Sequence, residues 1–136
     1  MEPAPIIISL PISDRRTSFA FYAEGLGLRA VGEPAEDGVP EPLQVALNDG
    51  LRLMLIPAGG FGWVVGDHEV AQRGHSECFL SLTAGSESGV DELVERARQA
   101  GAEILKEPAQ QPWGYAGLFA APDGHLWQAT AAGPPD

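Results

Sequence analysis

The chain has 136 residues, of which 44% are hydrophobic and 20% charged, a composition that suits one globular domain with a core of its own. The formal net charge of −11 excludes the basic surface that nucleic-acid binding needs, and no apolar run approaches the roughly 20 residues of a membrane-spanning helix. A single cysteine, Cys78, excludes an internal disulfide and the N-terminus lacks the pattern of a secretory signal, so we expect a cytoplasmic protein.

The first half of the sequence predicts a strand followed by a helix. Residues 6–12 form a β-branched, apolar run, which is typical of a strand. Ser13 or Asp14 can cap the helix that follows. Apolar residues then recur at the spacing of one helical face, at Phe19, Tyr22, Ala23 and Leu26.

Two Asp-Gly pairs, each between two short apolar runs, predict β-hairpins. An Asp-Gly pair in this setting is typical of a tight primed turn, which needs positive φ. The pairs are Asp49-Gly50, between expected strands over 43–47 and 51–56, and Asp123-Gly124, between expected strands over 118–121 and 125–130. The same device used twice indicates one module repeated.

The remaining segments complete a β-α-β-β-β order in each half. In the first half we expect a strand over 28–32 and a loop over 33–42. In the second we expect a strand over 77–83, a helix with a capping box at Ser88 and Asp91 that ends at Gly101, a strand over 102–106 and a loop over 107–117. The apolar face of that helix is Val90, Leu93, Val94 and Ala97. Two modules, about 5–58 and 76–131, are then joined by a Gly-rich linker over about 59–75.

A duplicated unit of this kind resembles the vicinal oxygen chelate superfamily, which includes glyoxalase I, extradiol dioxygenases and bleomycin-resistance proteins. The resemblance implies a single α+β domain in which two βαβββ modules form curved mixed sheets around a concave pocket. The matching residues are Leu10-Pro-Ile-Ser-Asp14, Ser18-Phe-Ala-Phe-Tyr22, Leu26-Gly-Leu28, Val90-Asp-Glu-Leu93, Ala100-Gly-Ala102 and Pro122-Asp-Gly-His-Leu-Trp127.

The same resemblance implies where a metal would bind. Metal-dependent members place four ligands, typically His or Glu, on the first and last strands of the two modules, and these positions correspond to Ile7, Met54, Glu77 and Gln128. Isoleucine cannot coordinate, a thioether suits Cu(I), and a neutral amide is a poor ligand for zinc or iron. One carboxylate is too few, so we expect no metal and no other cofactor.

Strand alternation predicts which side chains line the pocket instead. The expected pocket is mostly apolar with a few convergent polar groups, which is how sites for small organic ligands are usually built. Its expected residues from strands are Ile7, Ser9, Arg52, Met54, Glu77, Phe79 and Gln128, accompanied by Ile56, Ser81, Leu126 and Thr130. On the opposite faces we expect a core of Leu51, Leu53, Leu55, Cys78, Leu80, Leu82 and Trp127.

Glu77 and the loop aromatics each have two interpretations. Buried beside Phe79 and Met54, Glu77 would have a raised pKa and could act as a general base; alternatively, it pairs with Arg52 across the pocket. The loop aromatics could stack on a planar ligand, or they could pack in the interface of a homodimer, which is common in this superfamily. They are Trp63, Trp113 and Tyr115.

The sequence therefore supports two hypotheses of different class. The first is a metal-free, homodimeric protein that binds an aromatic or cationic drug or metabolite, as sequestering resistance proteins do. The second is a glyoxalase-like lyase or isomerase, or a dioxygenase, that uses a metal or Glu77 as a general base.

Overall fold

A computed structural model describes residues 4–131, and the chain divides into two compact units, Met1–Val70 and Ala71–Asp136. Unit 1 contains β1 (Ile6–Ile12), α1 (Arg15–Phe19), the π-helix η1 (Ala20–Gly25), β2 (Arg29–Val31), β3 (Leu43–Asn48), β4 (Leu51–Pro57) and α2 (Ala58–Val65). Unit 2 contains β5 (Leu80–Thr83), α3 (Glu87–Gln99), β6 (Glu103–Gln111), β7 (Gly114–Ala120) and β8 (Leu126–Thr130).

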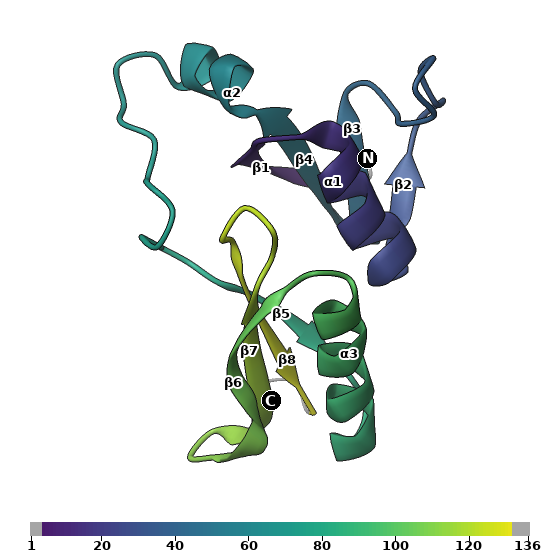
Figure 1. Cartoon of the computed structure of the whole chain (residues 1–136), viewed down its shortest axis with the longest axis vertical. Helices are drawn as coiled ribbons and strands as arrows, with labels where there is room; N and C mark the ends of the chain where they lie inside the picture. Colours follow the sequence, from purple (N-terminus) through teal and green to yellow (C-terminus); the bar gives the residue numbers. More distant parts are fainter. Residues whose placement is uncertain (1–3, 132–136) are drawn as a thin grey trace. The chain divides into compact units, whose positions relative to one another are not determined.

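The predicted repeat is confirmed, because each unit has the β-α-β-β-β order (Figure 1). Each sheet is open, mixed and four-stranded, with the orders β1-β4-β3-β2 and β5-β8-β7-β6. The first and last strands of each unit pair in parallel, and the other neighbours pair antiparallel. None of the helices within residues 4–131 has the length and apolar composition that crossing a membrane requires.

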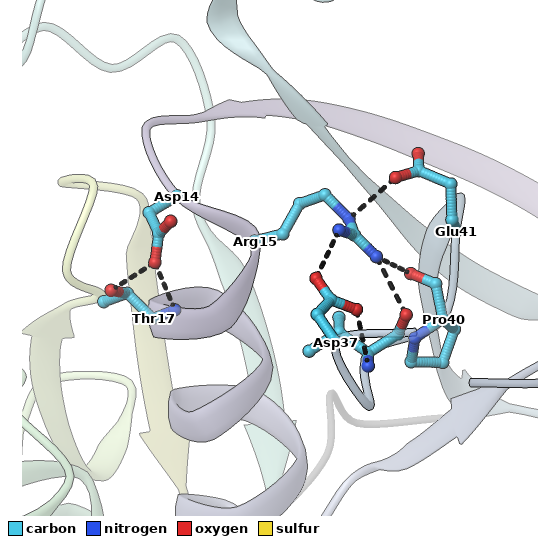
Figure 2. A network of polar contacts seen from close by, with 7 residues as sticks. Asp14, Arg15, Thr17, Asp37, Pro40 and Glu41 are labelled. Atoms are coloured by element: carbon cyan, nitrogen blue, oxygen red, sulfur yellow. Dashed lines mark hydrogen bonds and ion pairs between the residues drawn. The ribbon is translucent and has the colours of Figure 1, made fainter. Parts of the chain in front are cut away.

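The helix of unit 1 begins at a side-chain cap and changes its winding half-way. Asp14 accepts hydrogen bonds from the Thr17 backbone N–H and hydroxyl, each at 2.9 Å (Figure 2). After Phe19 the chain continues as the π-helix η1, whose i→i+5 bonding shifts the buried face. The predicted apolar face is therefore partly wrong: Phe21 is buried with Tyr22 and Leu26, while Phe19 and Ala23 are only partly buried.

Arg15 connects α1 to the loop before β3 (Figure 2). Its guanidinium donates to Asp37 Oδ2 at 2.8 Å and to the carbonyls of Val39 and Pro40 at 2.8 and 2.7 Å. Its Nε lies 3.2 Å from Glu41 Oε2 without hydrogen-bond alignment. The Arg15 side chain is 17% exposed, so these bonds are largely shielded from water and hold the loop against the helix.

The long connection predicted between the halves is partly wrong, because residues 58–65 form the helix α2. Three glycines in this segment disfavoured a helix. They also leave α2 with few side-chain atoms where it packs on the sheet. Even a Cβ on Gly60 would lie 3.4 Å from Ile56 Cγ2. The helix contacts β1 and β4, and tertiary packing of this kind overrides weak intrinsic propensity.

The core of unit 2 lies between α3 and one face of its sheet, along which the helix runs in Figure 1. The predicted apolar face of α3 is confirmed: Val90, Val94 and Ala97 are buried and Leu93 packs beside them. Gly117 on β7 allows this close approach, since a Cβ there would lie 2.9 Å from Val94 Cγ2.

The predicted C-terminal end of α3 is confirmed, whereas its predicted N-terminal cap is wrong. Gly101 follows the helix with φ of +107°, as a glycine after a helix C-terminus commonly does. The predicted capping box at Ser88 is wrong by two residues, because Ser86 is the N-cap and its hydroxyl accepts from the Gly89 N–H at 3.0 Å. Asp91 instead accepts a hydrogen bond of 2.6 Å from the Tyr115 hydroxyl.

The second half holds two further corrections. The loop predicted over 107–117 is wrong, because β6 continues to Gln111 and β7 begins at Gly114. Both Asp-Gly hairpins exist, but their primed turns do not: among the described residues, positive φ is confined to glycines, and Asp49 and Asp123 do not have it. Pro122 precedes Asp123 in the second turn, and proline at that place favours a turn with negative φ at both central residues.

Candidate functional site

The candidate site is a pocket of about 370 Å³ on the face of the unit 2 sheet that points away from α3. Its apolar wall is built from Phe79, Leu118 and Leu126, and Trp113 lies at the tip of the β6–β7 hairpin. Phe79 is 54% exposed and Trp113 is 61% exposed, so both aromatic rings are open to an incoming molecule. The remaining lining residues are Lys106, Gln111, Ala116, Gly117 and Gln128.

Gln128 connects the hairpin tip to the first strand of the unit. Its Oε1 accepts a hydrogen bond from Trp113 Nε1 at 3.0 Å, and its Nε2 donates to Ser81 Oγ at 3.2 Å. Strand pairing explains this contact, because Ser81 and Gln128 are partners in the parallel β5–β8 ladder and share a face. The indole of Trp113 is therefore held in place before a ligand arrives.

The structure brings together four of the side chains predicted for the pocket, Phe79, Trp113, Leu126 and Gln128. It places Tyr115 on the opposite face, against the core beneath α3. The hydrogen bond to Asp91, with desolvation and that carboxylate's charge, raises the pKa of Tyr115 above its usual value. Tyr115 is thus engaged in holding α3 to β7.

Glu77 does not take the buried strand position predicted for it. The strand predicted over 77–83 begins only at Leu80, and Glu77 is exposed in a bend before it. Cys78, predicted as a buried core thiol, is exposed as well. Glu77 is not among the described residues that line the pocket, so the burial on which its role as a general base depended is absent.

Strand register shows why Glu77 was misplaced. In unit 1, Met54 pairs with Ser9, and Ile7 lies two residues before Ser9 on the same face. In unit 2, Gln128 pairs with Ser81 in the same kind of parallel ladder. The counterpart of Ile7 is therefore Phe79, two residues before Ser81, because side chains on a strand alternate with a period of two.

Four further predicted residues lie together on one face of the unit 1 sheet. Ile7 pairs with Arg52 and Ser9 with Met54, so the four side chains form a patch across β1 and β4. The opposite face of the sheet holds the predicted core residues Leu53 and Leu55, which are at most 1% exposed. Trp63 is on α2 and is 85% exposed.

The donor set at these positions does not fit a catalytic divalent metal. With the register corrected, the four positions hold Ile7, Met54, Phe79 and Gln128, which offer no imidazole, carboxylate or thiolate. Among residues 4–131, no three His, Cys, Asp or Glu side chains are grouped so that they could hold a metal ion.

Sequence reasoning missed Lys106, Gln111, Ala116, Gly117 and Leu118, which lie on β6 and β7 where a loop had been expected over most of the segment. The polar composition of residues 106–111 and Pro108 concealed β6. The available signal was the alternation of Tyr115, Gly117 and Phe119 with Ala116 and Leu118, which extends the hairpin back from the Asp-Gly turn.

Comparison with known proteins agrees with the fold. The profile of the Glyoxalase/Bleomycin resistance protein/Dioxygenase superfamily matches residues 6–129, and the chain belongs to that superfamily. A search of the curated proteins found no match to the sequence.

Solved structures extend the comparison. Hypothetical protein SA1046 from S. aureus is 21% identical with a TM-score of 0.80, covering 97% of this chain and 95% of that one. A glyoxalase-related enzyme from Fulvimarina pelagi is 29% identical with a TM-score of 0.78, covering 95% and 86%. TnmS3, an antibiotic binding protein from Streptomyces sp. CB03234, is 24% identical with a TM-score of 0.63, covering 96% and 95%. The first and third support the fold alone.

Proposed function

We propose that the unit 2 pocket binds a small, planar, largely apolar organic molecule, and that the protein acts by binding and without a catalytic metal. The pocket itself carries this proposal. Its volume of about 370 Å³ suits a small organic ligand, and its walls are apolar with a few polar groups. Because Gln128 already holds the Trp113 indole, little conformational entropy is lost when a planar ring stacks on it.

A role in sequestration follows from the same features. A protein that encloses a drug or metabolite lowers its free concentration and needs no chemical step. TnmS3, which has this fold, is described as an antibiotic binding protein, and we extend that class of role to this chain.

Of the two ligand classes expected from the sequence, the aromatic one has the stronger support. Two exposed aromatic rings, Phe79 and Trp113, border the pocket. A cationic ligand could also lie over these rings, but the one charged side chain among the described lining residues is Lys106, which repels it.

The enzymatic alternative has one observation in its favour, since the Fulvimarina pelagi protein is described as a glyoxalase-related enzyme. It would need a metal or a base in the pocket of this chain. The four ligand positions lack suitable donors, and Glu77 is exposed outside the pocket lining. Binding without a metal is therefore the better-supported function.

A ligand screen tests the proposal. The untagged protein is screened by thermal shift against planar aromatic antibiotics, glutathione hemithioacetals and catechols, because a ligand that binds only the folded state raises the melting temperature. We expect the planar aromatic compounds to shift it, and elemental analysis to find far less than one metal ion per chain. Shifts confined to hemithioacetals or catechols, together with stoichiometric metal, would favour the enzyme.

Two exposed tryptophans provide a matched pair of variants. Trp113→Ala removes the ring at the pocket and should weaken a planar hit about threefold to tenfold in calorimetry, as expected for the loss of one stacking contact. Trp63→Ala removes an even more exposed ring from α2 and should leave the affinity unchanged. If Trp63→Ala weakens binding as much, Trp63 covers the ligand and the pocket extends beyond its present lining.

We also propose that the protein is a homodimer that associates through α2 and the edge strand β1. Neither element contains a charged residue, although the chain carries a net charge of −11. Ile6, Trp63 and Val64 are 68%, 85% and 66% exposed, and none of the eight residues of α2, all of them described, is buried. A second copy is the occupant we favour, because two strongly acidic chains repel least where both are uncharged and apolar.

A further inference from the structure

We propose that Lys106 makes the unit 2 pocket selective for a planar aromatic ligand that carries an anionic group such as a carboxylate. This inference rests on the proposed binding function and names the class of ligand and the residue that selects it. Neither the sequence pattern nor the resemblance pointed to this residue, and the sequence-based expectation was an aromatic or cationic ligand rather than an anionic one.

Two irregularities of β6 place Lys106 on the pocket face. Ile104 pairs with Phe119, and both belong to the face packed beneath α3. In a regular ladder the next residue, Leu105, would then oppose Leu118. The β6–β7 register shifts at this point, so Lys106 is the partner of Leu118 and takes the pocket-facing place. A bulge of this kind is a known means of re-aiming a side chain.

A second register shift in the same direction lies between Lys106 and Ala109. After it, the residues of β6 again alternate regularly between the two faces as far as the hairpin tip. Ala109 then opposes Ala116, and Gln111 opposes Gly114, on the pocket side of the sheet. The two shifts together therefore affect mainly residues 105–108. They place Lys106 opposite Leu118, on the pocket face of the sheet.

The Lys106 ammonium is available to a ligand. The adjacent carboxylate, Glu107, is occupied by Arg98 of α3, whose Nη2 donates to Glu107 Oε1 at 2.6 Å. That hydrogen bond lowers the pKa of Glu107 below its ordinary value, so the carboxylate is ionised and paired with Arg98 at neutral pH. The Lys106 side chain itself makes no hydrogen bond or ion pair with any of the described residues, 4–131.

The Gln128 amide, on the other side of the pocket, already makes two hydrogen bonds within the protein. Lys106, Leu118 and Gln128 lie in one row across β6, β7 and β8, whose spacing is about 4.8 Å. The amide of Gln128 accepts from Trp113 and donates to Ser81. A ring placed over Leu118 thus has on one side a neutral amide that already makes two hydrogen bonds and on the other an unpaired cation, and an anionic substituent is stabilised most strongly toward Lys106.

The overall charge of −11 does not remove this preference. Charges further apart than the Debye length, about 8 Å at physiological salt, are largely screened, whereas an ammonium in direct contact with a carboxylate on an apolar wall is screened much less. The net charge slows the approach of an anion, and the local cation decides how tightly it is held.

The experiment compares three probes that share a naphthalene ring and carry an anionic, a neutral or a cationic substituent. Binding of 2-naphthoate, neutral 2-naphthamide and the cation 2-naphthylmethylammonium to the full chain is measured by titration calorimetry. We expect 2-naphthoate to bind on the order of tenfold more tightly than the cation, with the amide in between. Lys106→Met should remove most of the advantage of 2-naphthoate and weaken 2-naphthamide much less, and Lys106→Glu should reverse the order of the two charged probes.

Arg29→Met is the matched control, since Arg29 is an exposed residue of β2 in unit 1 and its loss changes the net charge equally. It should leave all three affinities unchanged. Equal binding of the three probes by wild type, or an unaltered preference in Lys106→Met, overturns the anion selectivity while the binding function stands. Failure of every probe, together with a ligand screen that yields no hit, overturns both.

Discussion

Gln128 shows how one side chain can organise the candidate site from a position at which the resemblance implies a metal ligand. Changing Gln128 to Glu introduces the carboxylate that metal-dependent relatives typically have there, but Ile7, Met54 and Phe79 still offer no suitable donor. We expect the Gln128→Glu protein to bind no stoichiometric zinc, nickel or iron by elemental analysis after metal loading and dialysis. The Trp113 indole keeps an acceptor in this variant, so the folded structure should be retained.

Gln128→Leu is the companion substitution, because it removes the acceptor of Trp113 and the donor to Ser81 together. Loss of these exposed bonds should change the free energy of unfolding by only about 0.5–1.5 kcal/mol. Ligand affinity should fall, because the indole is no longer held in place. A metal-loaded Gln128→Glu protein with one ion per chain would contradict the assignment of the four positions.

Gly117 is a residue at which β7 closely approaches α3. A Cβ there would lie 2.9 Å from Val94 Cγ2 and 3.4 Å from the Lys106 carbonyl oxygen. We expect Gly117→Ala to lower the free energy of unfolding by about 1–3 kcal/mol, as overpacking of a core does, measured by urea denaturation. Gly85→Ala is the control, because nothing lies within 4 Å of its added methyl group; an equal loss at both positions would contradict the steric cause.

At the scale of elements, substitutions at the start of α3 can distinguish the observed N-cap residue, Ser86, from the predicted one, Ser88. The Ser86 hydroxyl accepts from the Gly89 N–H, while Ser88 lies within the helix and contacts only the Ser86 hydroxyl, at 3.1 Å. Ser86→Ala should lower the free energy of unfolding by about 1 kcal/mol. Ser88→Ala should be neutral or slightly stabilising, because alanine is the better helix former. Equivalent thermal denaturation curves for the two variants would contradict the cap.

The loop before β3 depends on Arg15 of α1. Arg15→Met leaves Asp37 and the Val39 and Pro40 carbonyls without their donor and should lower the free energy of unfolding by about 1.5–3 kcal/mol. Limited proteolysis should show faster cleavage within residues 33–42. Arg16→Met, on the exposed side of the same helix, is the control and should leave the cleavage rate unchanged.

The same loop predicts a dependence on pH. The Val39 backbone N–H, and then Arg15, hold the pKa of Asp37 below its ordinary value of 3.8. Since the folded-state pKa is the lower one, the stabilisation is fully present above pH 3.8 and is lost as the pH falls through the folded-state value. Stability measured from pH 5 downward should therefore fall less steeply in an Asp37→Asn variant than in wild type.

Helices and strands with regular periodicity could be predicted from the sequence, and the exceptions have physical causes. The apolar faces of α3, β4 and β8 follow the expected spacing and are mostly buried, although Leu51 and Leu93 are only partly so. In contrast, α2 consists of glycine and apolar residues without an amphipathic pattern, and β6 loses its alternation at two register shifts. The π-helical turn of η1 likewise moves the buried face to Phe21, which an α-helical period cannot anticipate.

At the scale of the whole molecule, the repeat was the most predictable feature, because two Asp-Gly turns and two helices recur in the same order. The candidate site was predictable where strand alternation held, at Phe79 and Gln128. Glu77 was misplaced because the start of β5 had to be counted from an uncertain strand end, and Lys106 was missed because its position depends on pairing with β7.

Self-association is the prediction that belongs to the whole molecule. Light scattering after size exclusion should give a mass of about twice the 14.3 kDa of one chain. Trp63→Glu places a carboxylate on the exposed face of α2 and should shift the protein toward monomer without loss of secondary structure. Trp113→Glu, at the pocket of unit 2, is the control and should remain dimeric; dissociation of this control alone would move the interface to the hairpin tip.

The irregular pairing of β6 has a consequence for how ligand preference diverges among relatives. Removing one residue between Lys106 and Ala109 would allow Leu105 to pair regularly with Leu118 in place of Lys106, while Ile104 and Phe119 would keep their places beneath α3. A length change of a single residue can thus invert the chemistry of a binding wall and leave the folding core intact. Homologues with identical letters in aligned columns need not share a ligand, and strand pairing is the better basis for comparing them.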